Sequence, residues 1–191
     1  MQEFEIFIRP VGPGDSIGLS KVQVDTWRDA YAGMLSESAL IDLDEMRSAM
    51  RWTRLIGTIE VPERLLVAEH EGEIIGFCHG GAGRRTVTKI GRYDHSVAEV
   101  YALYIDPSFQ GMGIGRELLG RFAQSALTDG FQSLSVQTLS ENRHARRFYE
   151  ALGAAEGVAL PSVVTGTPVD QIPYFWPDIG AMLAELEAAQ L

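Results

Sequence analysis

The sequence has one cysteine among its 191 residues, so it cannot form an internal disulfide, which agrees with a reducing compartment. Cys78 follows Phe77 in a strand-like run, and this setting predicts a small buried hydrophobic residue and not a nucleophile. No apolar run approaches the roughly 20 residues that a membrane span needs. The start Met1-Gln2-Glu3 also lacks the basic residues of a secretory signal. These absences predict a cytoplasmic protein without a membrane partner.

Basic residues are scarce as well, because 16 Lys and Arg stand against 26 Asp and Glu, for a net charge of −10. Nucleic acid binding needs a basic surface that neutralises phosphates, so we expect no nucleic acid partner. An acidic protein attracts cations such as amines, although net charge governs encounter rates and not chemistry. The composition, 46% hydrophobic and 22% charged, predicts one globular domain over residues 1–191.

A glycine-rich stretch, Gln110-Gly111-Met112-Gly113-Ile114-Gly115, lies between the strand-like run 97–105 and an amphipathic helix predicted over 113–128. The first N–H groups of a helix have no internal partners, and the peptide dipoles place partial positive charge there. Glycines let the backbone approach a pyrophosphate closely. The alternative is a turn that uses glycine only for its geometry.

Two other phosphate-binding motifs do not fit this stretch. No Gly-Lys-Ser/Thr follows it, which excludes a Walker loop. Arg116 occupies the position where a dinucleotide-binding fingerprint that starts at Gly111 needs its third glycine.

Together with a second segment, the loop resembles the acyl-CoA-binding signature of the GNAT superfamily of N-acyltransferases. The first part is Gln110-x-x-Gly113-x-Gly115 after Leu103-Tyr104-Ile105-Asp106-Pro107. The second part is Asn142-x-x-Ala145-x-x-Phe148-Tyr149-x-x-x-Gly153 after the strand-like run 134–138. The resemblance is strongest from about Val97 to Gly153, and the two motifs stand in the expected order.

The fold class that we expect is α/β (α+β), a mixed and mostly antiparallel sheet flanked by helices. A helix that crosses from the run 97–105 to the run 134–138 predicts that these two strands are parallel, and the resemblance implies that they splay around acyl-CoA. Hydrophobic patterns predict further elements. These are a strand over 4–9, a helix carrying Val24, Trp27, Tyr31 and Met34, one helix from Ser36 or Ser38 to Leu55, a hairpin around Glu71-Gly72, strands over 155–164 and 172–176, and a helix after Asp178.

The resemblance implies which residues contact acyl-CoA. They are Leu103, Tyr104, Ile105, Gln110, Gly111, Met112, Gly113, Ile114, Gly115, Arg116, Asn142 and Arg146. An oxyanion donor is expected from a backbone N–H of the strand 97–105. Two alternatives stay open, since Asn142 can be only an N-cap of the short helix and the arginines of that segment can be solvated.

Acyl transfer to an amine needs a proton acceptor and a proton donor. Tyr149 is the expected acid for the leaving thiolate, and its alternative role is packing beside Phe148. Glu99, the acid within the strand 97–105, is the expected base, since burial makes a carboxylate a better proton acceptor. It can instead be a surface acid at the strand start, with His79 and His95 as rival bases.

The first helices are expected to line the acceptor pocket, as they do in the family that the sequence resembles. Trp27 and Tyr31 are the candidate wall residues, and their alternative role is core packing. The segment with Arg84, Arg85, Lys89 and Arg92 is predicted to be a solvated basic insert.

The resulting hypothesis is an N-acetyltransferase that uses acetyl-CoA and no metal. It would acetylate a primary amine of a small cationic molecule by direct attack in a ternary complex. Alternatives are a protein N-terminus or lysine as acceptor, and a CoA-binding module without catalysis. The C-terminal helix either packs on the domain or meets a second subunit, which leaves a homodimer open.

Overall fold

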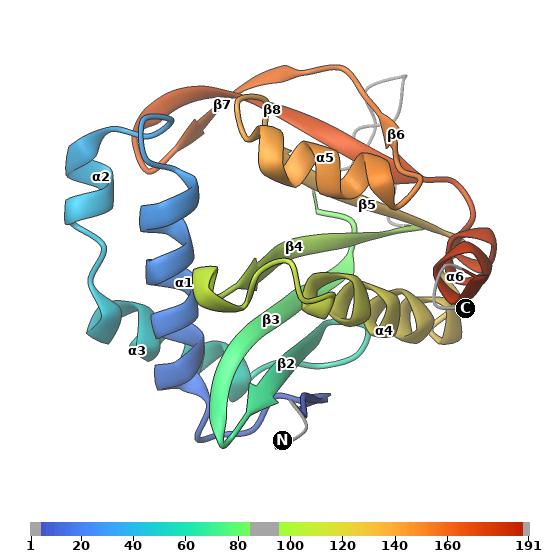
Figure 1. The fold of residues 1–191 in the computed structure, drawn as a ribbon, viewed down its shortest axis with the longest axis horizontal. Coiled ribbons are helices and arrows are strands. Elements are labelled where there is room, and N and C mark those ends of the chain that lie inside the picture. The colour runs from blue at the N-terminus through green and yellow to red at the C-terminus, as the bar shows by residue number, and fades with distance from the viewer. Residues whose placement is uncertain (1–4, 85–95, 189–191) are drawn as a thin grey trace.

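The computed structural model describes residues 5–84 and 96–188 (Figure 1). Its eight strands form one sheet in the order β1-β2-β3-β4-β5-β8-β6, and β7 pairs with β8. The strands are β1 (Phe7–Pro10), β2 (Arg64–His70), β3 (Glu73–Ala82), β4 (Val97–Ile105), β5 (Ser133–Leu139), β6 (Ala155–Glu156), β7 (Leu160–Val164) and β8 (Thr167–Trp176). Every pair is antiparallel except β4–β5, so the expected mixed, mostly antiparallel sheet with a central parallel pair is confirmed.

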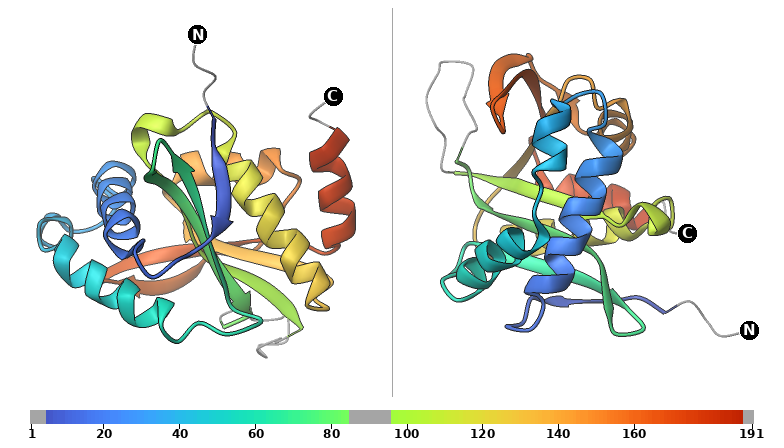
Figure 2. Two further views of the ribbon diagram at one scale, coloured as in Figure 1. Left: turned by 90° about the horizontal axis from the view of Figure 1, so that it is seen from below. Right: turned by 90° about the vertical axis from the view of Figure 1, so that its left-hand side faces the viewer.

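Helices cover both faces of the sheet, as Figure 2 shows. They are α1 (Ser16–Ala30), α2 (Glu37–Ile41), α3 (Glu45–Ile56), α4 (Ile114–Thr128), α5 (Arg143–Ala151), α6 (Ile179–Ala188) and the short 3₁₀ helix η1 (Pro107–Phe109). Side chains alternate along β2 and so divide the core into two clusters. Leu65 and Val67 pack with α1 and α3 in what we call the α1 core, while Leu66 and Ala68 pack with α4 and α6 in what we call the α4 core. Both clusters consist of buried hydrophobic residues, and burial of one face in each direction fixes the register of the central strands.

A β-bulge interrupts the alternation of β4 at Tyr101. The register with β3 runs from Gly80↔Val100 directly to His79↔Ala102, so Tyr101 is the extra residue. Before the bulge Val100 faces the α4 core, and after it Ala102 and Tyr104 face the α1 core. The bulge therefore re-aims the second half of β4.

The parallel seam between β4 and β5 is short. Its register pairs are Val97↔Ser133, Ala98↔Leu134, Glu99↔Ser135 and Val100↔Val136, and in the described chain the pairing stops there. Beyond Val100 the two strands diverge, and the backbone of β4 from the bulge to Ile105 has no β5 neighbour. The expected splay of this pair is thus present in the sheet register.

Some expected elements have different bounds. The single helix predicted from Ser36 or Ser38 to Leu55 is wrong, because α2 ends at Ile41 and Asp44 starts α3 by accepting a hydrogen bond from the Arg47 N–H at 2.7 Å. The predicted strand 155–164 is two pieces, β6 and β7. The predicted strand 172–176 begins earlier, at Thr167. Phe4, His95 and the insert residues Arg85, Lys89 and Arg92 lie outside the described residues.

The C-terminal helix α6 packs on the domain. Ile179, Met182 and Leu186 are buried in the α4 core, and the guanidinium of Arg116 donates to the carbonyl oxygen of Leu186. No helix in residues 5–84 and 96–188 combines the length and the apolar character that a membrane span requires.

Candidate active site

The glycine-rich loop joins the end of β4 to the N-terminus of α4. Gly111 and Gly113 have left-handed φ angles of 76° and 82°, and Gly113 is the N-cap of α4. A Cβ at either position would meet nothing within 4 Å, so both glycines border open space. The loop thus exposes backbone at the start of a 15-residue helix, which is the arrangement that binds phosphate groups.

Other loop residues serve packing. Gln110 Nε2 donates to the Ile105 carbonyl at 3.1 Å and so ties the loop to the end of β4. Ile114 is buried in the core, whereas Met112 is exposed. A Cβ at Gly115 would lie 3.4 Å from the ring of Phe148, so this glycine lets α4 approach α5 closely.

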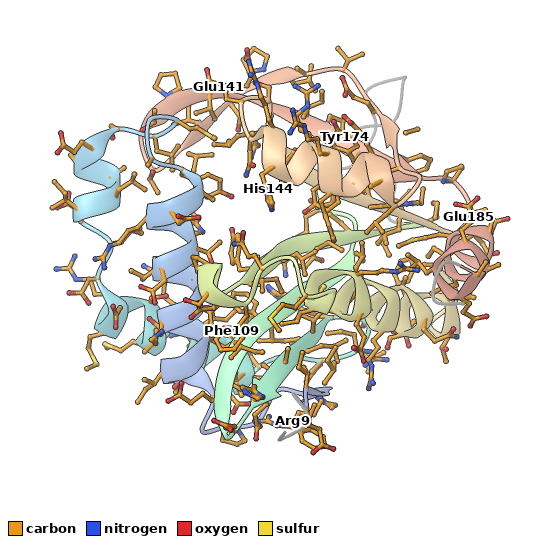
Figure 3. All side chains as sticks on the ribbon, in the orientation of Figure 1. Arg9, Phe109, Glu141, His144, Tyr174 and Glu185 are labelled. Atoms are coloured by element: carbon orange, nitrogen blue, oxygen red, sulfur yellow. The ribbon has the colours of Figure 1, made fainter. Side chains whose placement is uncertain are left out.

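The polar residues expected at acyl-CoA have partners within the protein. Arg116 bonds to Leu186, as described above. Arg146 donates to the Ser140 carbonyl at 2.9 Å, to the Tyr174 hydroxyl at 3.1 Å and to Glu156 at 3.0 Å; Figure 3 shows Tyr174 close to α5. Asn142 Oδ1 accepts from the Ala145 N–H at 3.0 Å and is the N-cap of α5, the alternative role considered for it. Its amide nitrogen is not used in that bond.

Leu103, Tyr104 and Ile105 form the part of β4 that lies beyond the seam. All three are half-buried, and their backbone pairs with β3 on one side only within the described sheet. An unpaired strand edge offers a row of N–H and C=O groups to an extended ligand.

Tyr149 lies on α5 and is buried, with 6% of its surface exposed. Its ring packs against Phe148, Tyr174 and Trp176. Burial raises the pKa of the Tyr149 phenol well above its ordinary value, and the nearby Cys78 and Tyr104 add to this shift. The phenol therefore keeps its proton and remains a donor at neutral pH.

A cavity of about 380 Å³ lies between β4, β5, the end of α1 and the β7–β8 hairpin; we call it the acceptor pocket. It is lined by Trp27, Tyr31, Arg84, Glu99, Val100, Tyr101, Tyr104, Gln137, Thr138, Leu139, Val163, Val164, Thr165 and Gln171. The pocket brings the expected residues Trp27, Tyr31 and Glu99 together. Tyr149 is not part of this lining.

Glu99 is on the wall of the acceptor pocket and is only 3% exposed. The alternative that Glu99 is a surface acid at the start of the strand is therefore wrong. Its Oε2 accepts a hydrogen bond from the backbone N–H of Arg84 at 2.6 Å. A carboxylate held in place and facing a cavity is suited to accept a proton from a bound ammonium group.

His79, the rival base, is committed to a different partner. Its Nε2 lies 2.7 Å from Glu63 Oε1. Burial lowers the pKa of His79, and the hydrogen bond with Glu63 opposes this shift. His79 does not line the acceptor pocket, although it packs edge-on against Tyr101.

Aromatic side chains form one side of the acceptor pocket. Trp27 contacts Tyr31 and Tyr104 edge to face, with ring centroids 5.2 and 6.5 Å away. Burial raises the pKa of both tyrosines. Within the described part of the chain the indole N–H of Trp27 is buried and has no hydrogen-bond partner. Such a donor is costly unless a ligand supplies an acceptor.

Two distant loops meet beside the acceptor pocket. The Ser36 N–H donates to Thr167 Oγ1 at 3.2 Å, and the Thr167 hydroxyl donates to Ser36 Oγ at 3.2 Å. Ser36 precedes α2, while Thr167 follows the turn whose residue Thr165 lines the pocket. These bonds connect the α1–α2 loop to the β7–β8 hairpin.

Sequence reasoning missed several pocket residues. Arg84 is expected in a solvated insert and its side chain is indeed 54% exposed, but the register Gly81↔Glu99 also brings the end of β3 next to the candidate base. The antiparallel pairing of β3 with β4 could have placed Arg84 beside Glu99, but only if the register of the two strands had been known. Val163, Val164 and Thr165 come from a hairpin that carries no motif. The described residues contain no group of His, Cys, Asp and Glu side chains suited to a metal ion.

The chain is similar in sequence and in fold to known proteins. It is 26% identical over 178 residues to the uncharacterized N-acetyltransferase YuaI of Bacillus subtilis, covering 93% of this chain and 96% of the relative. It is 27% identical over 123 residues to the L-amino acid N-acyltransferase MnaT of Escherichia coli, or 64% of each chain. The PaiA N-acetyltransferase of Thermoplasma acidophilum, solved in complex with coenzyme A, has the same fold, with a TM-score of 0.64, 18% identity and coverage of 90% of this chain and 99% of that chain.

Fold and relatives together define an acyl-CoA-dependent acetyltransferase. Residues 24–154 match the acetyltransferase (GNAT) family, and the chain belongs to that family. The expectation drawn from the two sequence motifs is confirmed at this level.

Proposed function

We propose that this N-acetyltransferase transfers the acetyl group of acetyl-CoA to a primary amine of a small molecule. The observation that supports this most directly is the acceptor pocket, in which a buried carboxylate, Glu99, and aromatic walls meet beside the diverging strands β4 and β5. An amine enters such a pocket as an ammonium ion, so the acceptor is cationic before it reacts. The net charge of −10 favours its approach.

Acetyl-CoA would supply an acetyl group activated as a thioester, and the chain offers groups suited to hold it. The backbone of Gly111 and Gly113 borders open space at the N-terminus of α4 and would hold the pyrophosphate. The edge of Leu103–Ile105 that has no β5 partner would pair with the amides of the pantetheine arm, except at the Ile105 carbonyl, which accepts from Gln110 and Thr26. The Asn142 amide nitrogen would add a donor, while Arg116 and Arg146 would support this site by holding α6 and α5 in place.

Proton transfers follow from the positions of two side chains. Glu99 would accept the ammonium proton, directly or through water. Tyr149 would donate a proton to the departing thiolate, since burial keeps its phenol protonated. A backbone N–H at the bulge of β4 would stabilise the negative charge that develops on the carbonyl oxygen.

The amine would attack the thioester directly in a ternary complex. A covalent route through cysteine would need an accessible thiolate. The one cysteine, Cys78, is fully buried in the α4 core, and burial raises the pKa of its thiol. No acetyl-cysteine step is therefore expected.

The acceptor has two further candidates. The name of the Escherichia coli relative states L-amino acids as its acceptors, which places amino acids among the small amines to test here. A protein N-terminus or lysine is the second candidate.

The test is the release of free thiol from acetyl-CoA in the presence of small amines and of peptides with free N-termini or lysines. Thiol release that depends on a small amine, with the acetylated amine identified by mass spectrometry, supports the proposal. Release only with peptides would favour the protein acceptor. Tight CoA binding without release for any amine would indicate a CoA-binding module.

A further inference from the structure

Arg84 adds a guanidinium to the wall of the acceptor pocket that also carries the carboxylate of Glu99. Its backbone N–H donates to Glu99 Oε2 at 2.6 Å, and both residues line the same cavity. A guanidinium at this place repels a second amine of a purely cationic acceptor. A cation and an anion in the wall of one pocket instead match a ligand that carries both charges.

The guanidinium of Arg84 is held in a defined position although its side chain is 54% exposed. Its Nη2 lies 2.7 Å from Glu63 Oε1, and its Cζ lies 3.8 Å from the centre of the Tyr101 ring. Tyr101 is itself fixed, because its hydroxyl donates to the Ala82 carbonyl at 2.5 Å. Glu63 is fixed by His79. A side chain ordered before binding loses less entropy when a ligand arrives.

The chemistry of the guanidinium suits a carboxylate. It has five N–H donors in a planar fork that matches the two oxygens of a carboxylate, and the Glu63 contact engages Nη2. The exposed half of the side chain lets a ligand reach it.

We propose that Arg84 is a specificity-determining residue that binds the carboxylate of the acceptor while the amino group of the same molecule faces Glu99. The acceptor class is then amino acids rather than simple cationic amines. This inference rests on the proposed function and names its substrate class. Arg84 takes no part in the chemical step.

The experiment compares L-amino acids with their amides, for example L-leucine with L-leucinamide and L-methionine with L-methioninamide, at saturating acetyl-CoA. Each amide keeps the α-amine and the side chain but lacks the carboxylate. The variants are Arg84→Gln, Arg84→Lys and, as a matched loss of charge, Arg121→Gln. Arg121 is a suitable control because its side chain is also 54% exposed and ion-paired, with Glu117 on α4, and it does not line the pocket.

The parent should prefer the amino acid over its amide in kcat/KM. Arg84→Gln should raise KM for amino acids about 10-fold, the loss expected for one charge-assisted contact, and leave KM for the amides within about twofold. For Arg84→Lys, KM for amino acids should lie between the values of the parent and of Arg84→Gln, since lysine keeps the charge and lacks the planar fork of N–H donors. Arg121→Gln should match the parent.

Equal effects of Arg84→Gln on amino acids and amides would overturn the inference. A parent that acetylates amides and simple amines in preference to amino acids would overturn it too, and the proposed function would stand. Absence of thiol release with every amine and amino acid tested would refute both. If Arg84→Gln does not fold, as judged by thermal unfolding, the amino acid-to-amide ratio of the parent and of Arg84→Lys decides the question.

Discussion

The carbonyl oxygen of Ile105, the last residue of β4, accepts a hydrogen bond from the side-chain amide of Gln110 at 3.1 Å. The same oxygen also accepts from the Thr26 hydroxyl of α1 at 3.1 Å. One backbone atom therefore connects the glycine-rich loop to the helix that carries Trp27. The loop proposed for acetyl-CoA and the wall proposed for the acceptor share this anchor.

Gln110→Leu should weaken CoA binding without unfolding the protein. The substitution removes the bond to Ile105 and leaves the loop glycines free to adopt other conformations, so we expect Kd for CoA to rise about fivefold and stability to fall by about 1 kcal/mol. Calorimetric titration and thermal unfolding measure the two effects. Gln124→Leu, at an exposed position of α4, is the control. An unchanged Kd would show that the anchor does not organise the loop.

Gly113→Asn tests whether the open space at the loop holds the pyrophosphate. Gly113 has φ of 82°, and asparagine tolerates this conformation better than other side chains, so the fold should be retained. We expect at least about a 10-fold loss of CoA affinity, because the new side chain occupies space that a ligand needs. Gly72→Asn is the matched control. Gly72 has φ of 83° and no atom within 4 Å of an added Cβ, but it lies in the β2–β3 turn and not in the glycine-rich loop. Equal CoA affinity in both variants would place the pyrophosphate elsewhere.

The sequence predicted the elements that carry local signals. The strand and helix on either side of Gln110–Gly115 and the helix capped by Asn142 were found because glycine, capping and periodicity act within a few residues. The two helices within 37–56 were merged, since Asp44 reads as an ordinary polar residue until its carboxylate is seen to bond to the Arg47 N–H. Asp15 is the N-cap of α1 by position, yet its carboxylate bonds to Arg9 and to the Gly12 N–H and to no N–H of the helix.

The candidate site was predictable only in part. Glu99 was singled out as an acid within an apolar strand, and its burial follows from the pairing of that strand on both sides. Arg84 and Thr165 come to the pocket through strand register and a hairpin, which depend on contacts distant in sequence. The partners of Arg116 and Arg146 also lie on distant elements, so their roles could not be read from the chain.

Tyr149→Phe should lower kcat by roughly 10- to 10³-fold with little change in affinity for acetyl-CoA, the range for loss of one general acid. Because burial raises the pKa of this phenol, the parent should lose no activity through its deprotonation as pH rises toward 10. Tyr174→Phe is the contrast. It loses bonds to Glu150 and Glu156 and should lower stability while kcat is kept. An unchanged kcat for Tyr149→Phe in a chemistry-limited assay would return Tyr149 to a packing role.

Glu99→Gln should keep the fold and CoA binding, since the amide is nearly isosteric and can still accept from the Arg84 N–H. Without the base, the rate should climb with pH as the amine loses its proton unaided, whereas the parent should level off at lower pH. Stopped assays over a pH series give both profiles. Profiles of the same shape that differ less than about threefold in kcat/KM, about 0.65 kcal/mol, would make Glu99 a bystander.

Asp15→Asn should lower stability at neutral pH by about 1 kcal/mol. The hydrogen bond from Arg9, 2.7 Å away, holds the pKa of Asp15 below its ordinary value of 3.8. A carboxyl group whose pKa is lowered in the folded state stabilises the fold at pH values above its ordinary pKa. This contribution is lost as the pH falls through the folded-state pKa. Urea unfolding at pH 7 and near pH 3 should therefore show a smaller difference between parent and variant in acid.

The control for that experiment is Asp25→Asn, which breaks the exposed pair between Asp25 and Lys21 and should cost only about 0.3 kcal/mol. A difference between parent and Asp15→Asn that stays constant with pH would mean that the carboxylate charge is unimportant there.

The short seam between β4 and β5 determines the width of the acceptor pocket. Glu99 lies on β4, and Trp27 and Tyr31 lie at the end of α1, which packs on β3 and β4. Gln137 lies on β5 and Thr165 lies in the turn between β7 and β8, on the other side of the seam. Four register pairs join the two halves of the sheet. The pocket residues Glu99 and Val100 belong to the last two pairs, and Tyr104 and Gln137 lie beyond them. A change in the angle between β4 and β5 beyond Val100↔Val136 would therefore change the width of the pocket, and the Ser36–Thr167 hydrogen bonds connect the α1–α2 loop to the β7–β8 hairpin. The width of the pocket therefore depends on the angle between the two halves of the sheet and not on the structure of either half alone.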